Sequence, residues 1–133
     1  MRIRTVAATL AVALLAVAAF AGESPLAPQA LAGMQRAHTA PRVVDVRTAE
    51  EYRDGHVPGA LNVPYDQIGA RAGMLDVAHD APIVVYCRTG KRAAIAQQTL
   101  EGLGYTHVRL LDGSFQAWQA AQLPVVREAP PSR

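Results

Sequence analysis

Residues 82–104 read PIVVYCRTGKRAAIAQQTLEGLG, and this stretch decides the fold. Its first part, Ile83–Tyr86, is short, apolar and mostly β-branched, which is typical of a buried strand. After the loop Cys87–Lys91, the stretch Arg92–Leu103 contains strong helix formers, and Gly104 is placed to end a helix. One face of this helix is expected to carry the apolar side chains of Ala96, Leu100 and Leu103. The stretch therefore predicts a strand, a loop and a helix, with a cysteine at the carboxyl end of the strand.

Strands and helices alternate on both sides of this stretch. Thr48 and Glu51 form the pattern of a capping box, which predicts a short helix ending near residues 54–55. Ser114 is expected to cap a further helix that runs through residues 118–121. The other expected elements are strands at 42–46, 61–63 and 107–111, a helix near 66–72 and a weak helical stretch at 28–36. Such alternation predicts an α/β fold with a mainly parallel central sheet and helices on both faces.

The first 21 residues have the layout of a signal peptide. Arg2 and Arg4 precede a run over residues 6–20 that is apolar except for Thr9, and small residues flank Phe20 in the pattern that signal peptidase recognises. The run is shorter than the roughly 20 residues that a membrane-spanning helix needs. We therefore expect cleavage after Ala21, export to the periplasm and no stable membrane association afterwards, with secretion beyond the periplasm left open. Residues 22–133 would then form one domain, with its core at about 42–126.

The charge of the expected domain is balanced. Two of the 13 Lys and Arg residues lie in the signal segment, which leaves 11 to match the 11 Asp and Glu residues. Because no long run of like charges remains, the sequence does not favour nucleic acid or an anionic membrane as a partner. The single cysteine cannot form a disulfide within the chain, so it is a buried residue, half of an intermolecular disulfide or a reactive thiol.

The neighbours of Cys87 favour a reactive thiol. The start of a helix presents free backbone N–H groups, and Gly90 allows the loop to turn so that these groups point toward one place. Arg88, Lys91 and Arg92 add positive charge within five residues. We therefore expect the pKa of Cys87 to be lowered and the loop to bind an anion. The sequence shows no Cys or His spacing that indicates a metal site.

Three motifs in order resemble those of rhodanese domains, over residues 42–126. The first comprises residues 45–47, 51–52, 55–60 and 62–64, the second is the Cys87 loop, and the third comprises residues 113–115 and 117–118. The resemblance implies a rhodanese fold and a Cys87 that carries sulfur as a persulfide. It implies that the loop residues bind the substrate, namely Arg88, Thr89, Gly90, Lys91 and Arg92.

The resemblance also bears on the reaction. Related phosphatases have a loop one residue longer, whereas only four residues separate Cys87 from Arg92 here. The loop thus resembles that of sulfurtransferases, and its Arg and Lys resemble those of members that use thiosulfate. The implied reaction moves sulfur from a small anionic donor to cyanide or a thiol, without a metal or organic cofactor. Two alternatives stay open, a non-catalytic persulfide carrier and a phosphatase or arsenate reductase on the same fold.

Some polar residues receive structural assignments. Asp45 and Arg47 are expected to form an ion pair near the site rather than to act in catalysis. His56 precedes a turn, where a histidine commonly serves as a hydrogen-bonding group. Trp118 is expected to pack in the core.

Overall fold

The computed structural model describes residues 23–129, so the proposed signal peptide lies outside the described residues. Four parallel strands form one sheet in the order β2-β1-β3-β4. Their bounds are Arg42–Asp45 for β1, Leu61–Asn62 for β2, Ile83–Tyr86 for β3 and Val108–Leu110 for β4. The expected parallel sheet is confirmed, with each strand except β3 one or two residues shorter than predicted.

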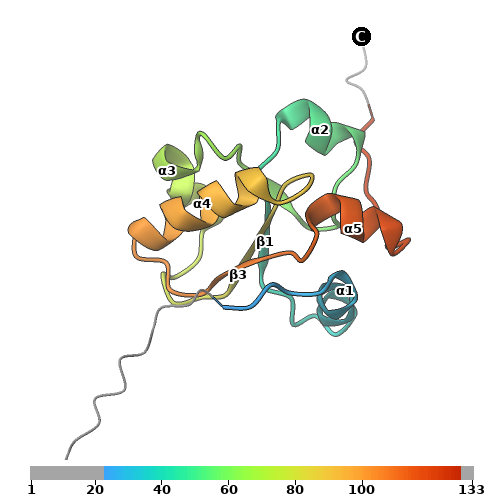
Figure 1. The fold of residues 1–133 in the computed structure, drawn as a ribbon, viewed down its shortest axis with the longest axis horizontal. Coiled ribbons are helices and arrows are strands. Elements are labelled where there is room, and N and C mark those ends of the chain that lie inside the picture. Colours follow the sequence, from blue (N-terminus) through green and yellow to red (C-terminus); the bar gives the residue numbers. More distant parts are fainter. Residues whose placement is uncertain (1–22, 130–133) are drawn as a thin grey trace, which may run out of the picture.

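Helices cover both faces of the sheet (Figure 1). On one face lie α3 (Ile68–Arg71), the 3₁₀ helix η1 (Ala72–Leu75) and α4 (Lys91–Gly102), and on the other lie α1 (Pro28–Arg36) and α5 (Ser114–Ala120). The short helix α2 (Ala49–Asp54) lies near the carboxyl ends of the strands. No helix in residues 23–129 is long and apolar enough to cross a membrane.

Strand β3 shows how the sequence builds two cores. Ile83 and Val85 point to the core beneath α4, whereas Val84 and Tyr86 point to the core beneath α1 and α5. Both faces are buried, which explains why the strand is a continuous apolar run. Cys87 continues the alternation and joins the core beneath α4.

Two details of α4 and α3 differ from the predictions. Helix α4 buries Ala93, Ala96 and Leu100, while Leu103 is 45% exposed, because the helix ends at Gly102 and Leu103 lies beyond it. The helix predicted near 66–72 starts later, at Ile68, and tightens into a 3₁₀ turn that ends with Asp76 in a left-handed conformation. The predicted capping box at Thr48 and the predicted α1 are confirmed.

Ser114 does not cap α5 as predicted. Gly113 is the N-cap residue, with φ of +70°, and the Ser114 side chain makes no capping hydrogen bond. A Cβ at Gly113 would lie 2.5 Å from the Cβ of Ala117, so only glycine fits that position. The Ser114 hydroxyl is therefore available for another contact.

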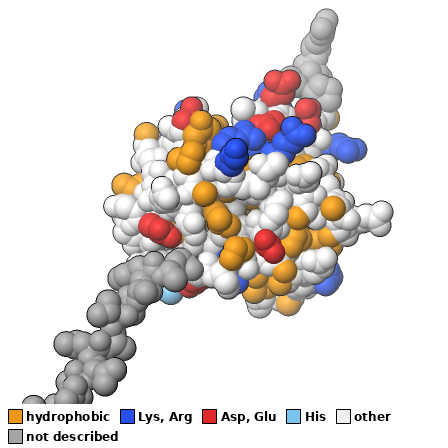
Figure 2. Space-filling view, viewed as in Figure 1, with side chains coloured by type: hydrophobic (Ala, Val, Ile, Leu, Met, Phe, Trp, Pro, Cys, Tyr) orange, Lys and Arg blue, Asp and Glu red, His pale blue; other side chains and the backbone are white. Residues whose placement is uncertain are grey.

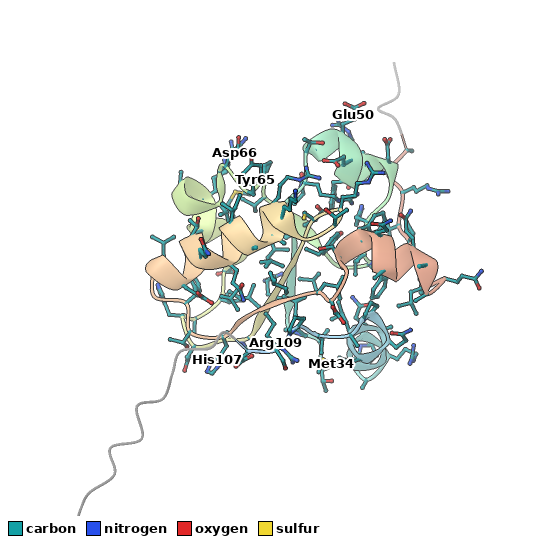
Figure 3. All side chains as sticks on the ribbon, in the orientation of Figure 1. Met34, Glu50, Tyr65, Asp66, His107 and Arg109 are labelled. Carbon is teal, nitrogen blue, oxygen red and sulfur yellow. The ribbon has the colours of Figure 1, made fainter. Side chains whose placement is uncertain are left out.

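Residues 23–26, the N-terminal segment, lie alongside β4. Leu26 pairs with Leu111 in a parallel bridge, and the core at α1 thus extends to residues before position 42. Glu23 lies 2.6 Å from His107, and Arg109 donates a hydrogen bond of 2.8 Å to the Ser24 carbonyl. Figure 3 shows His107 and Arg109 at the end of the molecule opposite Glu50 of α2. The segment therefore runs along β4, from Glu23 near the start of the strand to Leu26 at its carboxyl end.

Candidate active site

Cys87 lies where β3 ends and the chain turns toward α4. The strand ends at Tyr86, and the helix begins at Lys91 with Gly90 as its N-cap residue. The cysteine is only 1% exposed, so its sulfur lies within the loop rather than on its surface. The structure thus places the thiol at the N-terminus of a 12-residue helix, where backbone N–H groups lack intrahelical acceptors.

Backbone N–H groups surround the sulfur of Cys87. The Gly90 amide donates a hydrogen bond of 3.0 Å to Sγ. Burial alone raises the pKa of the thiol, but hydrogen bonds from the amides of Ala93, Gly90, Thr89 and Arg92 lower it further than burial raises it. The pKa of Cys87 is therefore below its ordinary value, and the thiolate is favoured, as the sequence predicted.

Gly90 makes this arrangement possible. Its φ of +124° lies in a region that residues with a Cβ rarely adopt. This conformation turns the Gly90 N–H back toward the sulfur and, in the same residue, starts α4. A side chain here would strain the backbone at the point where the amides converge.

The charged side chains of the loop lie in two different settings. Arg88 and Lys91 are exposed, and among the described residues neither makes an ion pair. Arg92 is instead paired with Glu51 of α2, through Nη1 at 2.8 Å and Nη2 at 3.0 Å. Figure 2 shows Lys and Arg side chains gathered beside acidic ones at this end of the molecule. Arg88 and Lys91, two of the three predicted cations, are thus available to bind an anion.

A buried polar network lies behind the loop. Arg47 and Asp45 form the predicted ion pair at 2.6 Å, with both side chains at most 5% exposed. The Tyr86 hydroxyl donates to Asp45 at 2.8 Å and accepts from the Val57 amide at 3.0 Å. The Arg47 guanidinium lies 4.3 Å from the ring centre of Phe115. This network joins β1, β3 and α5 beneath the site, which fits a structural role.

His56 also has the structural role that the sequence predicted. Its Nδ1 lies 2.7 Å from the Tyr52 carbonyl oxygen, and its ring stacks on the Tyr52 ring with centroids 3.6 Å apart. Trp118 is fully buried in the core, as predicted.

A hollow of about 270 Å³ opens beside the loop. It lies between α2 and α5, and its lining residues are Arg47, Glu51, Asp54, Gly55, Arg88, Phe115 and Gln119. Arg88 directly follows the buried cysteine, so the hollow adjoins the loop that holds the thiol. Its volume suits a small molecule. Among residues 23–129, no group of three or more His, Cys, Asp or Glu side chains is arranged to hold a metal ion.

Sequence reasoning found the loop but missed its neighbours. The sequence predicts a capping role for Glu51 but not its ion pair with Arg92, which lies 41 residues away. The first turn of α5 also contacts the loop, because the amides of Phe115 and Gln116 donate to the carbonyls of Cys87 and Arg88 at 3.0 and 3.1 Å. No local pattern in the sequence indicates either contact.

Comparisons with known proteins agree with this geometry. The model of the rhodanese-like domain family matches residues 27–121. The chain is 35% identical over 77 residues to the uncharacterized protein YqhL of Bacillus subtilis, a match that spans 58% of this chain and 60% of YqhL. It is 34% identical over 70 residues to the thiosulfate sulfurtransferase PspE of Escherichia coli, which spans 53% of this chain and 67% of PspE.

A solved structure supports the same assignment of the fold. The crystal structure of the Alr3790 protein from Anabaena superposes with a TM-score of 0.72 at 25% sequence identity. The superposition covers 79% of this chain and 94% of that one. This chain and the Alr3790 protein therefore share one fold, a sheet with helices on both faces.

Proposed function

Because the chain belongs to the rhodanese-like domain family, we propose that it is a sulfurtransferase that carries sulfane sulfur on Cys87 as a persulfide. The observation that carries the proposal is the set of loop amides that lowers the pKa of a buried thiol. A thiolate is the nucleophile that sulfur transfer requires. The same amides suit an anionic persulfide, since it too has a negatively charged sulfur that accepts hydrogen bonds.

The first half-reaction loads the enzyme. The Cys87 thiolate attacks the outer sulfur of thiosulfate, a sulfur–sulfur bond forms with Sγ, and the bond to the sulfite sulfur breaks. Sulfite leaves with the bonding electron pair. Arg88 and Lys91 are exposed and unpaired among the described residues, so they supply the positive charge that attracts the dianion. Arg92 is committed to Glu51, and we assign it to holding the loop.

The second half-reaction unloads the enzyme. A thiolate or cyanide attacks the outer sulfur of the persulfide, and the bond to Sγ breaks with return of the electron pair to Cys87. The buried position of Sγ leaves the outer sulfur as the atom that an acceptor can reach. No general base is needed, because the attacking and leaving groups are already anions.

The experiment that tests the proposal is intact mass spectrometry. The protein and its Cys87→Ser variant are incubated with thiosulfate, and then cyanide is added while thiocyanate is measured. We expect the protein to gain one sulfur atom that is lost as thiocyanate appears, and the variant to gain none. Failure to load sulfur would exclude thiosulfate as the donor and favour a partner-dependent persulfide carrier. Turnover of an aryl phosphate or arsenate instead would favour a phosphatase or arsenate reductase.

The roles of the two free cations are tested separately. We expect Arg88→Gln and Lys91→Gln each to raise the KM for thiosulfate by about tenfold or less, with a smaller effect in high salt. Arg36→Gln, which removes an exposed arginine on the distant helix α1, is the matched control and should leave KM unchanged. An equal rise of KM in the control would show that KM depends on the overall charge of the protein and not on these two positions.

We also propose export to the periplasm, on the basis of the sequence pattern in residues 1–21. Expression with the full N-terminus in a Gram-negative host should yield periplasmic protein whose first residue is Gly22. N-terminal sequencing of that fraction tests this. Protein that retains Met1 and stays with the membrane fraction would instead indicate an uncleaved anchor.

A further inference from the structure

Ser114 holds a backbone conformation that serine rarely adopts. Its φ is +55°, in the left-handed region, and it directly follows Gly113 at +70°. This region is disfavoured for residues that carry a Cβ, whereas glycine occupies it without that cost. Because this conformation costs free energy, a buried serine that adopts it is a candidate for a side chain with a specific role.

The Ser114 hydroxyl contacts the backbone of the candidate nucleophile. The side chain is buried, at 1% exposure, and it makes no capping hydrogen bond to α5. Its oxygen accepts a hydrogen bond from the Cys87 N–H at 3.3 Å, across 27 residues of sequence. Within residues 23–129 this is the one hydrogen bond found for the side chain.

The first turn of α5 thus holds Cys87 on both of its backbone polar groups. The Ser114 hydroxyl receives the Cys87 N–H, and the Phe115 amide donates to the Cys87 carbonyl at 3.0 Å. On the other side, the Gly90 amide at the start of α4 donates to Sγ. The backbone of Cys87 is therefore fixed by α5, while its side chain is directed toward the amides of the loop.

We propose that the Ser114 hydroxyl is a positioning group, which fixes the peptide before Cys87 and so directs Sγ into the ring of loop amides for sulfur transfer. The catalytic part of this inference rests on the proposed function. Without the hydroxyl, the Cys87 N–H would be buried without its partner, which is costly. The peptide would rotate or the loop would shift to satisfy it, and the contact between Gly90 and Sγ would lengthen.

Glycine is the informative substitution at this position. Ser114→Gly removes the hydroxyl and also relieves the strain, so the relief offsets part of the cost of the unpaired Cys87 N–H. Ser114→Ala removes the hydroxyl and keeps the strain. The matched control is Gln122→Gly, because Gln122 has φ of +54° and is exposed just beyond the other end of α5.

The readout is the rate of Cys87 alkylation by iodoacetamide as a function of pH, followed by intact mass. Only one cysteine is present, so the whole signal comes from Cys87. We expect Ser114→Gly to melt at a higher temperature than Ser114→Ala, with an alkylation profile shifted by about one pH unit upward from wild type and sulfur loading at neutral pH about tenfold slower. Ser114→Ala should show the same shift with a lower melting temperature, and Gln122→Gly should show none.

An unchanged alkylation profile in Ser114→Gly would overturn the inference, since the hydroxyl would then not position the thiol. This outcome is distinguishable from failure of the proposed function, because alkylation requires no sulfur donor. A wild-type protein that loads no sulfur, yet shows the shift in Ser114→Gly, would overturn sulfur transfer from thiosulfate and support the positioning of Cys87 by Ser114.

Discussion

The Glu51 carboxylate and the Arg92 guanidinium meet in a two-point ion pair, with distances of 2.8 and 3.0 Å. Glu51 lies in α2, and Arg92 lies in the first turn of α4. The same carboxylate accepts hydrogen bonds from the Thr48 amide at 3.0 Å and the Thr48 hydroxyl at 3.1 Å. One side chain therefore caps its own helix and anchors the start of the helix that follows the Cys87 loop.

We predict that Glu51→Gln lowers stability in a pH-dependent way. Hydrogen bonds from Arg92, then from Thr48, lower the pKa of Glu51 to about 2, below its ordinary value of 4.5. A lowered pKa contributes stability above the ordinary value, and this stability is lost as the pH falls from about 4.5 to about 2. Because the carboxylate is 33% exposed, solvent screening reduces the contribution to about 1 kcal/mol.

Urea unfolding at pH 7 and at about pH 3 measures this effect. The difference in unfolding free energy between wild type and Glu51→Gln should be present at pH 7 and shrink at the lower pH. Glu50→Gln is the matched control, because Glu50 is the neighbouring acid in the first turn of α2 and no ion pair is found for it among the described residues. A difference of equal size at both pH values would contradict an electrostatic origin.

The reactivity of Cys87 should depend on pH through its own titration. The loop amides lower the pKa of the thiol despite its burial, so the thiolate persists to lower pH in the folded protein than in the unfolded chain. We expect the rate of sulfur loading to rise with pH and to level off below the ordinary thiol pKa. The folded state gains stability from this thiolate above the ordinary pKa, and the gain is lost as the pH falls through the folded-state value.

The control for this prediction is the same protein in concentrated urea. Alkylation there should follow the ordinary titration of a cysteine, and the folded protein should reach half of its maximal rate at a lower pH. Coincident profiles would show that the amides do not stabilise the thiolate.

Gly90→Ala should impair the loop more than it impairs the fold. An alanine at φ of +124° is strained, and relief of that strain would turn the Gly90 amide away from Sγ. We expect sulfur loading to fall by more than about tenfold and stability to fall by about 1 kcal/mol. Gly102→Ala is the matched control, because Gly102 lies in the same helix with open space around its Cβ position. Normal loading by Gly90→Ala would contradict the need for this backbone conformation.

Local sequence patterns were sufficient to predict the layers of the fold. The apolar run at Ile83–Tyr86 and the capping box at Thr48 act through neighbours in sequence, and both appear in the structure where expected. The Cys87 loop was also predictable, since a helix that starts beside a cysteine directs amides toward it. Elements whose ends depend on tertiary packing, such as α3, were predicted less accurately.

Contacts between residues far apart in the sequence could not be predicted from local patterns. Ser114 was expected to cap α5, because serine commonly does so in the residue before a helix. Instead the backbone turns through two consecutive left-handed residues, and Gly113 takes the capping position. The hydroxyl then meets an amide 27 residues away. Such a contact depends on how α5 packs against the end of β3, which no short sequence pattern encodes.

The buried network of Asp45, Arg47 and Tyr86 either supports the fold alone or also affects the reactivity of Cys87, and a substitution at Tyr86 tests which. We predict that Tyr86→Phe lowers the free energy of unfolding by about 1–3 kcal/mol, because the fully buried hydroxyl serves both the Val57 amide and the Asp45 carboxylate. Urea unfolding measures the loss. Tyr65→Phe is the matched control, since no hydrogen bond is found for the Tyr65 hydroxyl among residues 23–129, and it should change stability little.

Sulfur loading by the folded Tyr86→Phe protein then separates the two roles. If the network only supports the loop from below, the loading rate per folded molecule should stay within about threefold of wild type, since the amides that hold Sγ come from the loop and the start of α4 and not from Tyr86. A loss of more than about tenfold in a protein that is still folded would instead assign the Asp45, Arg47 and Tyr86 network a direct part in setting the charge at the thiol.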